Sequence, residues 1–263
     1  MKQLTTINPN TIDYIECHAT GTPVGDLVEL NSMDSFFSKY NHSPLLGSVK
    51  SNLGHLLTTA GIASLIKVIL SMNKNIITPT INISQPLTSN QGNIGGKNIV
   101  TSPIKWEKDQ KRAGVNAFGF GGCNAHLILE KSDPPQPPLK RGENEKVPLK
   151  KGDKGGSKNN QKLAIIGMDA YFGGCDGLEA LDRTIYNGKQ HFIDLPPQRW
   201  QGINQETELL KNYGFTTGKV PKGAYIKDFE FNFLRFKIVP KEEEQLIPQQ
   251  LLMLKVADRA IQD

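Results

Sequence analysis

Residues 47–70 read GSVKSNLGHLLTTAGIASLIKVIL and combine a short apolar run, a polar loop and an amphipathic segment. The centre of this stretch is KSNLGH, residues 50–55, which places lysine, serine, asparagine and histidine directly before the amphipathic segment. A helix N-terminus has a partial positive charge and unpaired N–H groups, so donors gathered there favour negative charge. The stretch therefore predicts a place that stabilises developing negative charge.

The amphipathic segment is predicted to be a helix because its apolar residues recur at helical spacing. These residues are Ile62, Leu65, Ile66, Ile69 and Leu70. Thr58 or Thr59 is the expected N-cap. The other positions are mostly small, and only Lys67 is charged before Ser71. We therefore expect a helix that is buried on much of its circumference and fixes the loop before it.

Length and composition allow one large domain or two ordinary ones, with 263 residues of which 37% are hydrophobic. The net charge is +5, and residues 132–161 hold seven basic against four acidic residues. Because these basic residues lack interleaved aromatic residues, a solvated tether is a better interpretation than a nucleic-acid-binding surface. We expect no nucleic-acid partner.

The cysteines indicate a reducing, cytoplasmic setting. Cys17, Cys123 and Cys175 are too few and too scattered for a disulfide framework or a zinc site. The sequence shows no signal peptide and no apolar run of about 18 residues that could span a membrane.

Two strand-length runs each lead to a histidine. Residues 12–17 precede His18, which opens the loop HATGTPVGD, and residues 45–49 precede the loop that ends in His55. The carboxyl ends of strands are the usual position of ligand sites in α/β sheets. A lone histidine is more often structural than catalytic, but two in similar contexts favour function.

The rest of the first half is expected to form a helix over residues 27–37, an irregular surface excursion over residues 76–98 and a β-hairpin over residues 112–130. The hairpin turn contains Gly119, Gly121 and Gly122. It is not a phosphate-binding loop, because no Lys-Ser/Thr pair follows and the next element is a strand. We expect it to bring backbone N–H groups close to a bound carbonyl.

Residues 132–161 mark the domain boundary. They contain five prolines and alternating charges and cannot bury a core, so we interpret them as a flexible linker. After the linker, KLAIIGM is an expected strand beginning at Lys162, residues 177–186 suit a short helix, and Pro248 fits the first turn of a final helix. The predicted domains are residues 1–131 and 162–263.

Three segments closely resemble, in order and spacing, motifs of a known family. ECHATGTPVGD (residues 16–26), KSNLGH (50–55) and GFGGCNAH (119–126) resemble the C-terminal half of β-ketoacyl synthases, the condensing domains of polyketide and fatty-acid synthases. The resemblance implies a thiolase-like α/β fold with αβαβα layers. Residues 162–263 resemble the start of a second ketosynthase-like domain, of the chain-length-factor type found in polyunsaturated fatty-acid and heterocyst-glycolipid synthases.

The resemblance implies a decarboxylative Claisen condensation of an acyl thioester with malonyl-acyl carrier protein. His18 and His55 match the histidines that donate hydrogen bonds to the enolate, and Lys50 would hold the electrostatics around His55. The backbone N–H of Phe120 matches an oxyanion-hole donor.

The resemblance also implies substrate contacts. Thr20 and Thr22 match residues that hydrogen-bond the phosphopantetheine arm, although ordinary loop hydrogen bonding explains them equally well. The remaining implied substrate-binding residues are Asn52, Gly119, Gly121 and Gly122. No cofactor or metal is expected to bind directly, because the substrates are carried on the phosphopantetheine of acyl carrier protein.

Three departures from the family pattern stand out. Ala19 replaces a glycine and is tolerable only if its φ is negative, and Cys123 replaces a threonine as a small packing residue. The nucleophile's Thr-Ala-Cys-Ser elbow has no counterpart, and none of the three cysteines is a convincing substitute.

We therefore expect a synthase fragment that is inactive alone, whose partners are acyl carrier protein, the missing N-terminal half and a ketosynthase-type dimer when complete. The alternative is a non-catalytic subunit or scaffold that complements a condensing domain on another chain. A metal site of Cys17, His18 and His55 is disfavoured, because neighbours on a strand point to opposite faces.

Overall fold

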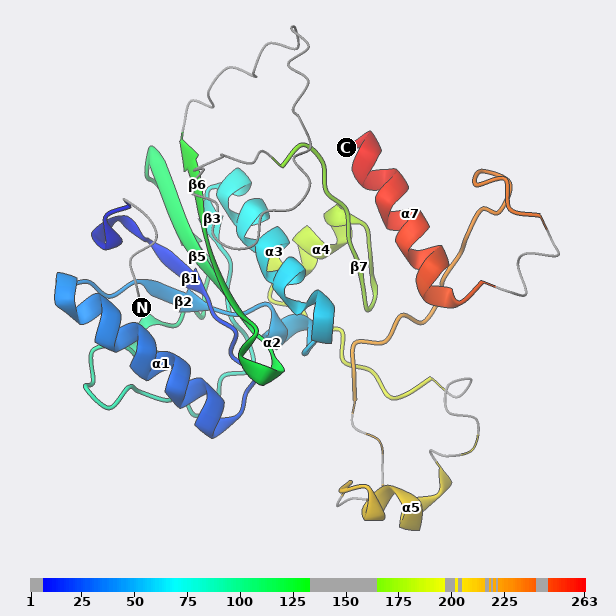
Figure 1. Ribbon diagram of the computed structural model, residues 1–263, viewed down its shortest axis with the longest axis horizontal. Coiled ribbons are helices and arrows are strands. Elements are labelled where there is room, and N and C mark those ends of the chain that lie inside the picture. Colours follow the sequence, from blue (N-terminus) through cyan, green and yellow to red (C-terminus); the bar gives the residue numbers. More distant parts are fainter. Residues whose placement is uncertain are drawn as a thin grey trace, which may run out of the picture.

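A mixed four-stranded sheet forms the centre of the first half (Figure 1). The computed structural model describes residues 7–132, 165–196, 202, 205–215, 218, 220, 222–239 and 246–263. The strands are β1 (Tyr14–Glu16), β2 (Leu45–Gly47), β5 (Gln110–Phe118) and β6 (Asn124–Ser132), in the order β2-β1-β5-β6. β1 runs parallel to β2 and β5, whereas β5 and β6 are antiparallel. The β5–β6 pair is the predicted hairpin.

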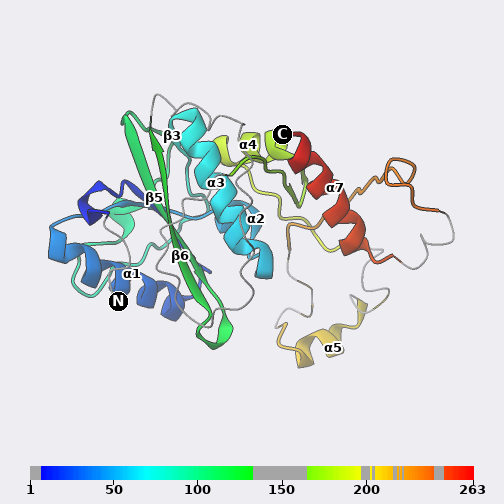
Figure 2. The same cartoon turned by 45° about the horizontal axis from the view of Figure 1, so that its top comes forward.

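Helices cover both faces of this sheet. α1 (Pro23–Phe37) lies on one face and α3 (Ala60–Lys74) on the other, as the two views show (Figures 1 and 2). Neighbouring residues of β1 point to opposite faces, so Ile15 packs with the α1 residues and Tyr14 with the α3 residues. The predicted α/β class is confirmed.

α3 is buried on two sides, as expected, but the predicted apolar stripe is partly wrong. Val68 and Met72 pack on the sheet, whereas Ala63 and Ile66 pack on the second half of the chain. Ile62 is 53% exposed. The single-stripe prediction fails because α3 packs against the sheet on one side and against the second half on another, so its buried residues lie on more than one face.

Several boundaries differ from the sequence-based expectation. α1 begins at Pro23 rather than at residue 27, because proline suits the first helical turn. The KSNLGH loop contains a helical turn, α2 (Lys50–Leu53), and a 3-10 turn over Leu57–Thr59 precedes α3. Thr59 is the N-cap residue of α3 but makes no side-chain capping bond. The excursion over residues 76–98 begins with β3 (Ile76–Ile77), which pairs with β4 (Ile104–Lys105).

The second half packs its first elements against α3. β7 (Tyr171–Phe172), β8 (Cys175–Asp176) and the predicted helix α4 (Leu178–Tyr186) share a buried cluster with α3. Residues 165–170 form no strand, so the strand expected from KLAIIGM is wrong over its described part. Ile166 is 93% exposed there and takes part in none of the strand pairings found among the described residues.

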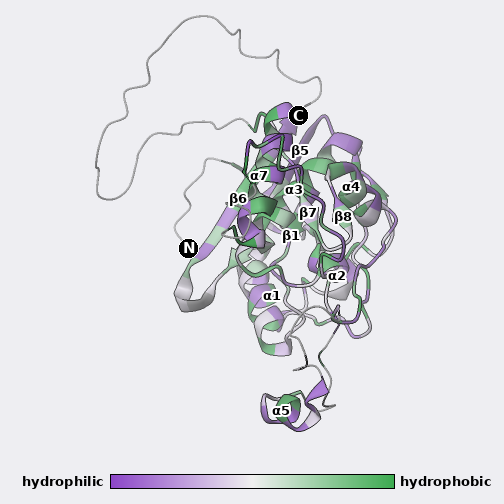
Figure 3. Cartoon of the chain, turned by 90° about the vertical axis from the view of Figure 1, so that its right-hand side faces the viewer, coloured by the Kyte–Doolittle hydropathy of each residue, from purple (hydrophilic) through white to green (hydrophobic). Residues whose placement is uncertain are grey.

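Two further helices lie in the described part of the second half. They are α5 (Thr207–Asn212) and α7 (Pro248–Gln262), which begins at the predicted proline. α4 and α7 each carry hydrophobic and hydrophilic residues (Figure 3). In the part of the chain that the structure describes, no helix has the length and apolar character needed to cross a membrane. The predicted linker, except Ser132, and residues 162–164, 197–200 and 240–245 lie outside the described residues.

Candidate active site

Two histidines from different strand ends face each other. His18 follows β1, and His55 follows α2 after β2. Their rings lie edge to face, with 5.3 Å between centroids and 85° between planes. The parallel pairing of β1 and β2 explains this meeting, because it puts the carboxyl ends of both strands at the same edge of the sheet.

Backbone N–H groups select the same tautomer in both imidazoles. The N–H of Phe118 donates to Nδ1 of His18 at 3.4 Å, and the N–H of Leu57 donates to Nδ1 of His55 at 3.0 Å. A neutral imidazole has one donor and one acceptor nitrogen, so the hydrogen-bond pattern assigns the proton to Nε2 in each ring. Both histidines therefore present an Nε2–H donor.

The surroundings keep these imidazoles neutral. Burial lowers the pKa of His18 to about 4, with further lowering from the charge of Lys50 and from His55. Burial and then Lys50 also lower the pKa of His55. Lys50 is itself only 8% exposed, and burial lowers its pKa. The site thus combines two neutral donors with a nearby buried lysine, an arrangement that stabilises an oxyanion.

Two carboxylates of α1 hold the loop that follows His18. Glu29 accepts hydrogen bonds from the N–H groups of His18 at 2.8 Å and Ala19 at 2.9 Å. Asp26 accepts from the N–H groups of Thr20 at 3.0 Å and Gly21 at 3.2 Å. Side chains of one helix therefore accept hydrogen bonds from four successive backbone N–H groups of the loop.

Ala19 does not meet the condition set for it from the sequence. Its φ is +30°, in the left-handed region that favours glycine, whereas a negative φ was the condition for tolerating its methyl group. The condition is therefore not met, and the N–H groups of His18 and Ala19, which both donate to the Glu29 carboxylate, favour this bend in the loop.

The predicted pantetheine-contacting threonines lie on the exposed side of the same loop. Thr20 Oγ1 and Thr22 Oγ1 are 3.0 Å apart and hydrogen-bond each other. This geometry is compatible with hydrogen bonding within the loop and with contact to a ligand, so the role of both threonines stays a prediction.

The glycine turn lies beside His18. It joins β5 to β6, and the ring centroid of Phe118, the last residue of β5, is 5.4 Å from that of His18. Phe120 opens a 3-10 turn over Phe120–Gly122. Gly121 and Gly122 have φ values of +73° and +83°, which only glycine adopts readily. Gly119, Gly121 and Gly122 are exposed, so the turn presents backbone next to the imidazole.

Asn52 faces the second half of the chain. It is fully buried, its Nδ2 donates to the carbonyl of Lys189 at 2.7 Å, and its own carbonyl accepts from the N–H of His191 at 3.1 Å. The structure thus places it on the side of α2 that faces the second half, and its predicted substrate contact stays a prediction.

The cysteines differ in their accessibility. Cys17 and Cys175 are buried, and burial raises the pKa of both thiols, which disfavours the nucleophilic thiolate. Cys123 is exposed at the hairpin turn. Over the described ranges, no group of three potential ligands is close enough to hold a metal ion.

Sequence reasoning missed three contributors to the site. Phe118 acts through its backbone N–H, which no sequence pattern announces. Glu29 lies three residues after Asp26 and so shares its helix face, a signal that was available. The pairing of buried Lys67 with Glu16 at 2.8 Å was hidden, since a single lysine in an apolar helix usually reaches solvent.

Comparisons with known proteins give matches to three family models along the chain. Residues 2–84 match the model described as "Beta-ketoacyl synthase, C-terminal domain", and residues 160–263 match "Beta-ketoacyl synthase, N-terminal domain". Residues 94–157 match "Ketoacyl-synthetase C-terminal extension". Most of the chain is therefore covered by models of one family.

Relatives and solved structures bear related names. A polyunsaturated fatty acid synthase component of Thraustochytrium sp. is 38% identical over 98% of this chain and 12% of its own length. Highly reducing polyketide synthase srdA of Neurospora crassa is 45% identical over 46% of this chain and 6% of its own length. The structure titled "PfaC Keto synthase-Chain length factor" is 44% identical over 97% of this chain and 25% of that chain, with a TM-score of 0.47.

The chain spans about an eighth or less of the length of these two curated relatives. The chain matches the C-terminal and the N-terminal domain models of the same family, and it pairs two histidines at the strand ends. The chain belongs to the β-ketoacyl synthase family.

Proposed function

We propose that residues 1–131 supply the enolate-stabilising half of a β-ketoacyl synthase that extends fatty-acid or polyketide chains. The observation that carries this proposal is the pair of neutral imidazoles, each with Nδ1 occupied by a backbone N–H and Nε2–H free to donate. Donors fixed before reaction stabilise charge that develops in the transition state.

The proposed chemistry has two charge-developing steps. Loss of CO2 from a malonyl thioester leaves the electron pair of the broken C–C bond as an enolate, whose oxygen accepts from Nε2–H of His18 and His55. The enolate carbon then attacks an acyl thioester held on a cysteine, forms the new C–C bond and expels the cysteine thiolate. In the second step the N–H of Phe120 is the proposed donor to the tetrahedral oxyanion.

Neutral histidines are needed for this role. An imidazolium would transfer a proton to the enolate rather than stabilise it, and the lowered pKa of His18 keeps its ring neutral at physiological pH. Lys50 contributes its charge without proton transfer, by favouring the neutral form of both rings.

Several features of the working protein are part of the proposal. The acyl and malonyl groups arrive on the phosphopantetheine of acyl carrier protein, with Thr20 and Thr22 contacting the arm and Asn52 and the glycine turn completing the substrate-binding site. Residues 162–263 begin a second, chain-length-factor-type domain after the linker. We further propose a cytoplasmic location and a ketosynthase-type dimer for the complete protein.

Complementation tests the catalytic role. The chain is mixed with a separately expressed N-terminal condensing-domain half that carries the nucleophilic cysteine, and CO2 release from malonyl-acyl carrier protein is measured. Loss of one oxyanion donor costs roughly 100- to 1,000-fold in rate. The rate of CO2 release is therefore expected to fall by that factor in His18→Ala and in His55→Ala.

The control and the contradictory result are equally specific. His42→Ala removes a histidine whose ring contacts the carbonyl of Ile12 and the ring of Phe37, outside the site, and the variant is expected to retain the rate. Unchanged CO2 release in the His18 and His55 variants would refute their assigned roles. The chain alone is expected to form no β-ketoacyl product.

A non-catalytic complementing subunit is the second candidate. The burial of Cys17 and Cys175, which raises the pKa of both thiols, favours it. Size-exclusion chromatography with the N-terminal half separates the two, because a stable complex without turnover supports the scaffold role.

A further inference from the structure

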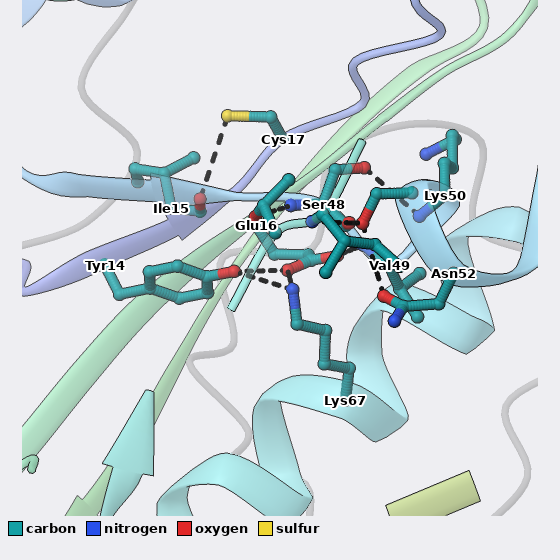
Figure 4. Close-up of polar contacts among 12 residues, drawn as sticks. Tyr14, Ile15, Glu16, Cys17, Ser48, Val49, Lys50, Asn52 and Lys67 are labelled. Carbon is teal, nitrogen blue, oxygen red and sulfur yellow. Dashed lines mark hydrogen bonds and ion pairs between the residues drawn. The ribbon is translucent and has the colours of Figure 1, made fainter. Parts of the chain in front are cut away.

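A fully buried ion pair joins β1 to α3 in the core (Figure 4). Lys67 Nζ of α3 is 2.8 Å from Glu16 Oε2 of β1, and both side chains have 0% exposure. Tyr14 Oη donates to the same carboxylate oxygen at 2.5 Å and accepts from Lys67 Nζ at 3.0 Å. The three groups form a closed network inside the core.

The second oxygen of Glu16 extends the network to the other strand end. Glu16 Oε1 accepts from the N–H of Val49 at 2.6 Å. The β1–β2 ladder ends where the N–H of Cys17 donates to the carbonyl of Gly47 at 2.8 Å. Beyond that bond, the Glu16 carboxylate links β1 to Val49, the residue that precedes Lys50.

One carboxylate therefore joins three elements that carry the candidate site. Glu16 lies two residues before His18, Val49 lies one residue before Lys50, and Lys67 belongs to the helix that follows His55. We propose that the Glu16–Lys67 pair is a positioning device that sets His18 relative to Lys50 and His55. This inference rests on the proposed function for its catalytic meaning.

Stability alone explains the pair poorly. Removing two charges from water costs several kcal/mol per ion, and replacing a buried pair by apolar residues is often neutral or stabilising. An ion pair, however, requires a particular placement of both partners, whereas an apolar contact tolerates sliding. A displacement of about 1 Å between catalytic groups costs roughly a hundredfold in rate, so a placement constraint matters here.

The test measures geometry in the full chain without substrate. Nuclear Overhauser effects between the His18 and His55 rings report their approach, and hydrogen exchange of the Val49 amide reports its bond to Glu16. The double variant Glu16→Gln/Lys67→Met removes both charges and leaves no unpaired buried ion. We expect it to fold, to lose at least half of the ring-to-ring signal and to exchange the Val49 amide at least tenfold faster.

A matched control separates positioning from general loosening. Asp34 is another fully buried carboxylate, which accepts from Ser89 Oγ at 2.5 Å and from Asn93 Nδ2 at 3.0 Å. It lies in α1, sixteen positions after His18, and its partners Ser89 and Asn93 belong to neither histidine loop. Asp34→Asn is expected to lower the unfolding midpoint while leaving the ring-to-ring signal unchanged.

Each remaining outcome counts against the proposal. A folded double variant with wild-type ring geometry overturns it, as does an equal loss of signal in Asp34→Asn. Failure of the double variant to fold also overturns it, since the pair would then be required for the fold itself. Because no thioester enters the measurement, a failed condensation assay leaves this result intact, and the two proposals fail separately.

The complemented enzyme supplies a kinetic readout. Misplaced histidines are expected to lower kcat for decarboxylation by roughly ten- to a hundredfold while KM for malonyl-acyl carrier protein stays near the wild-type value. A rise in KM with unchanged kcat would assign the pair to binding instead.

Discussion

The side-chain amide of Asn52 donates a hydrogen bond of 2.7 Å to the backbone carbonyl of Lys189, across 137 positions of sequence. The backbone carbonyl of Asn52 accepts a second bond, of 3.1 Å, from the N–H of His191. α2, which contains Lys50, is therefore supported from behind by a segment of the second half.

This contact predicts a stability effect. Asn52→Ala leaves the Lys189 carbonyl without its donor, which is expected to lower the free energy of unfolding by about 1–2 kcal/mol, measured by urea denaturation. The control Gln190→Ala removes an exposed acceptor, bonded at 2.9 Å by Asn82, and is expected to cost less than about 0.5 kcal/mol. Equal effects would mean that burial of Asn52 does not govern the contact.

Two glycine substitutions are expected to have opposite signs. Ala19→Gly relieves a left-handed φ of +30°, and after the entropy of glycine is subtracted we expect a gain of about 0.5 kcal/mol. Ala63→Gly puts glycine inside α3 at a fully buried position and should lose about 1 kcal/mol or more. Thermal and urea unfolding measure both, and destabilisation by Ala19→Gly would contradict the strain.

His18 makes stability depend on pH. Its folded pKa of about 4 is below the ordinary value of 6.5, so the unfolded chain binds more protons between these values. The stability contributed by neutral His18 is present above pH 6.5 and is lost as pH falls toward 4. Urea denaturation across this range should show a flatter profile for His18→Gln than for the wild type. Identical profiles would show that His18 is not responsible.

Lys50 is expected to tune both imidazoles. Burial is the main cause of their lowered pKa values and the Lys50 charge adds to it, so Lys50→Met should raise the pKa of His18 and of His55 toward 6.5. Histidine resonances followed by NMR during a pH titration measure the change. Lys39→Met makes the same charge change at an exposed residue and should move neither. A falling pKa in Lys50→Met would exclude the electrostatic role.

Much of the site could be predicted from local sequence. The strand ends before His18 and before KSNLGH, the β-hairpin with its glycine turn, and the helices that begin near Thr59 and at Pro248 follow from apolar spacing and turn chemistry. Membership in the β-ketoacyl synthase family confirms the thiolase-like fold class that the motifs implied.

The rest depended on partners distant in sequence. Lys67 is buried because Glu16 meets it across 51 positions, and helical spacing alone favoured Ile62 as a buried residue instead. The positive φ of Ala19 results from the carboxylate of Glu29, which arrives from another element. KLAIIGM lacks strand structure where described, since an apolar run becomes a strand only when a neighbouring strand pairs with it.

The backbone bonds to the two Nδ1 atoms have a consequence for assembly. Both N–H donors, Phe118 and Leu57, belong to the same folded half as the histidines, so folding of that half already settles ring orientation. The entropy of arranging the two donors is lost during folding, so in the proposed complementation it is not lost again when a thioester-bearing half binds. A cysteine thioester supplied by that half would meet two hydrogen-bond donors that are already oriented. Mutations at the association surface are then expected to alter the affinity between the halves without changing the pKa or tautomer of the two imidazoles.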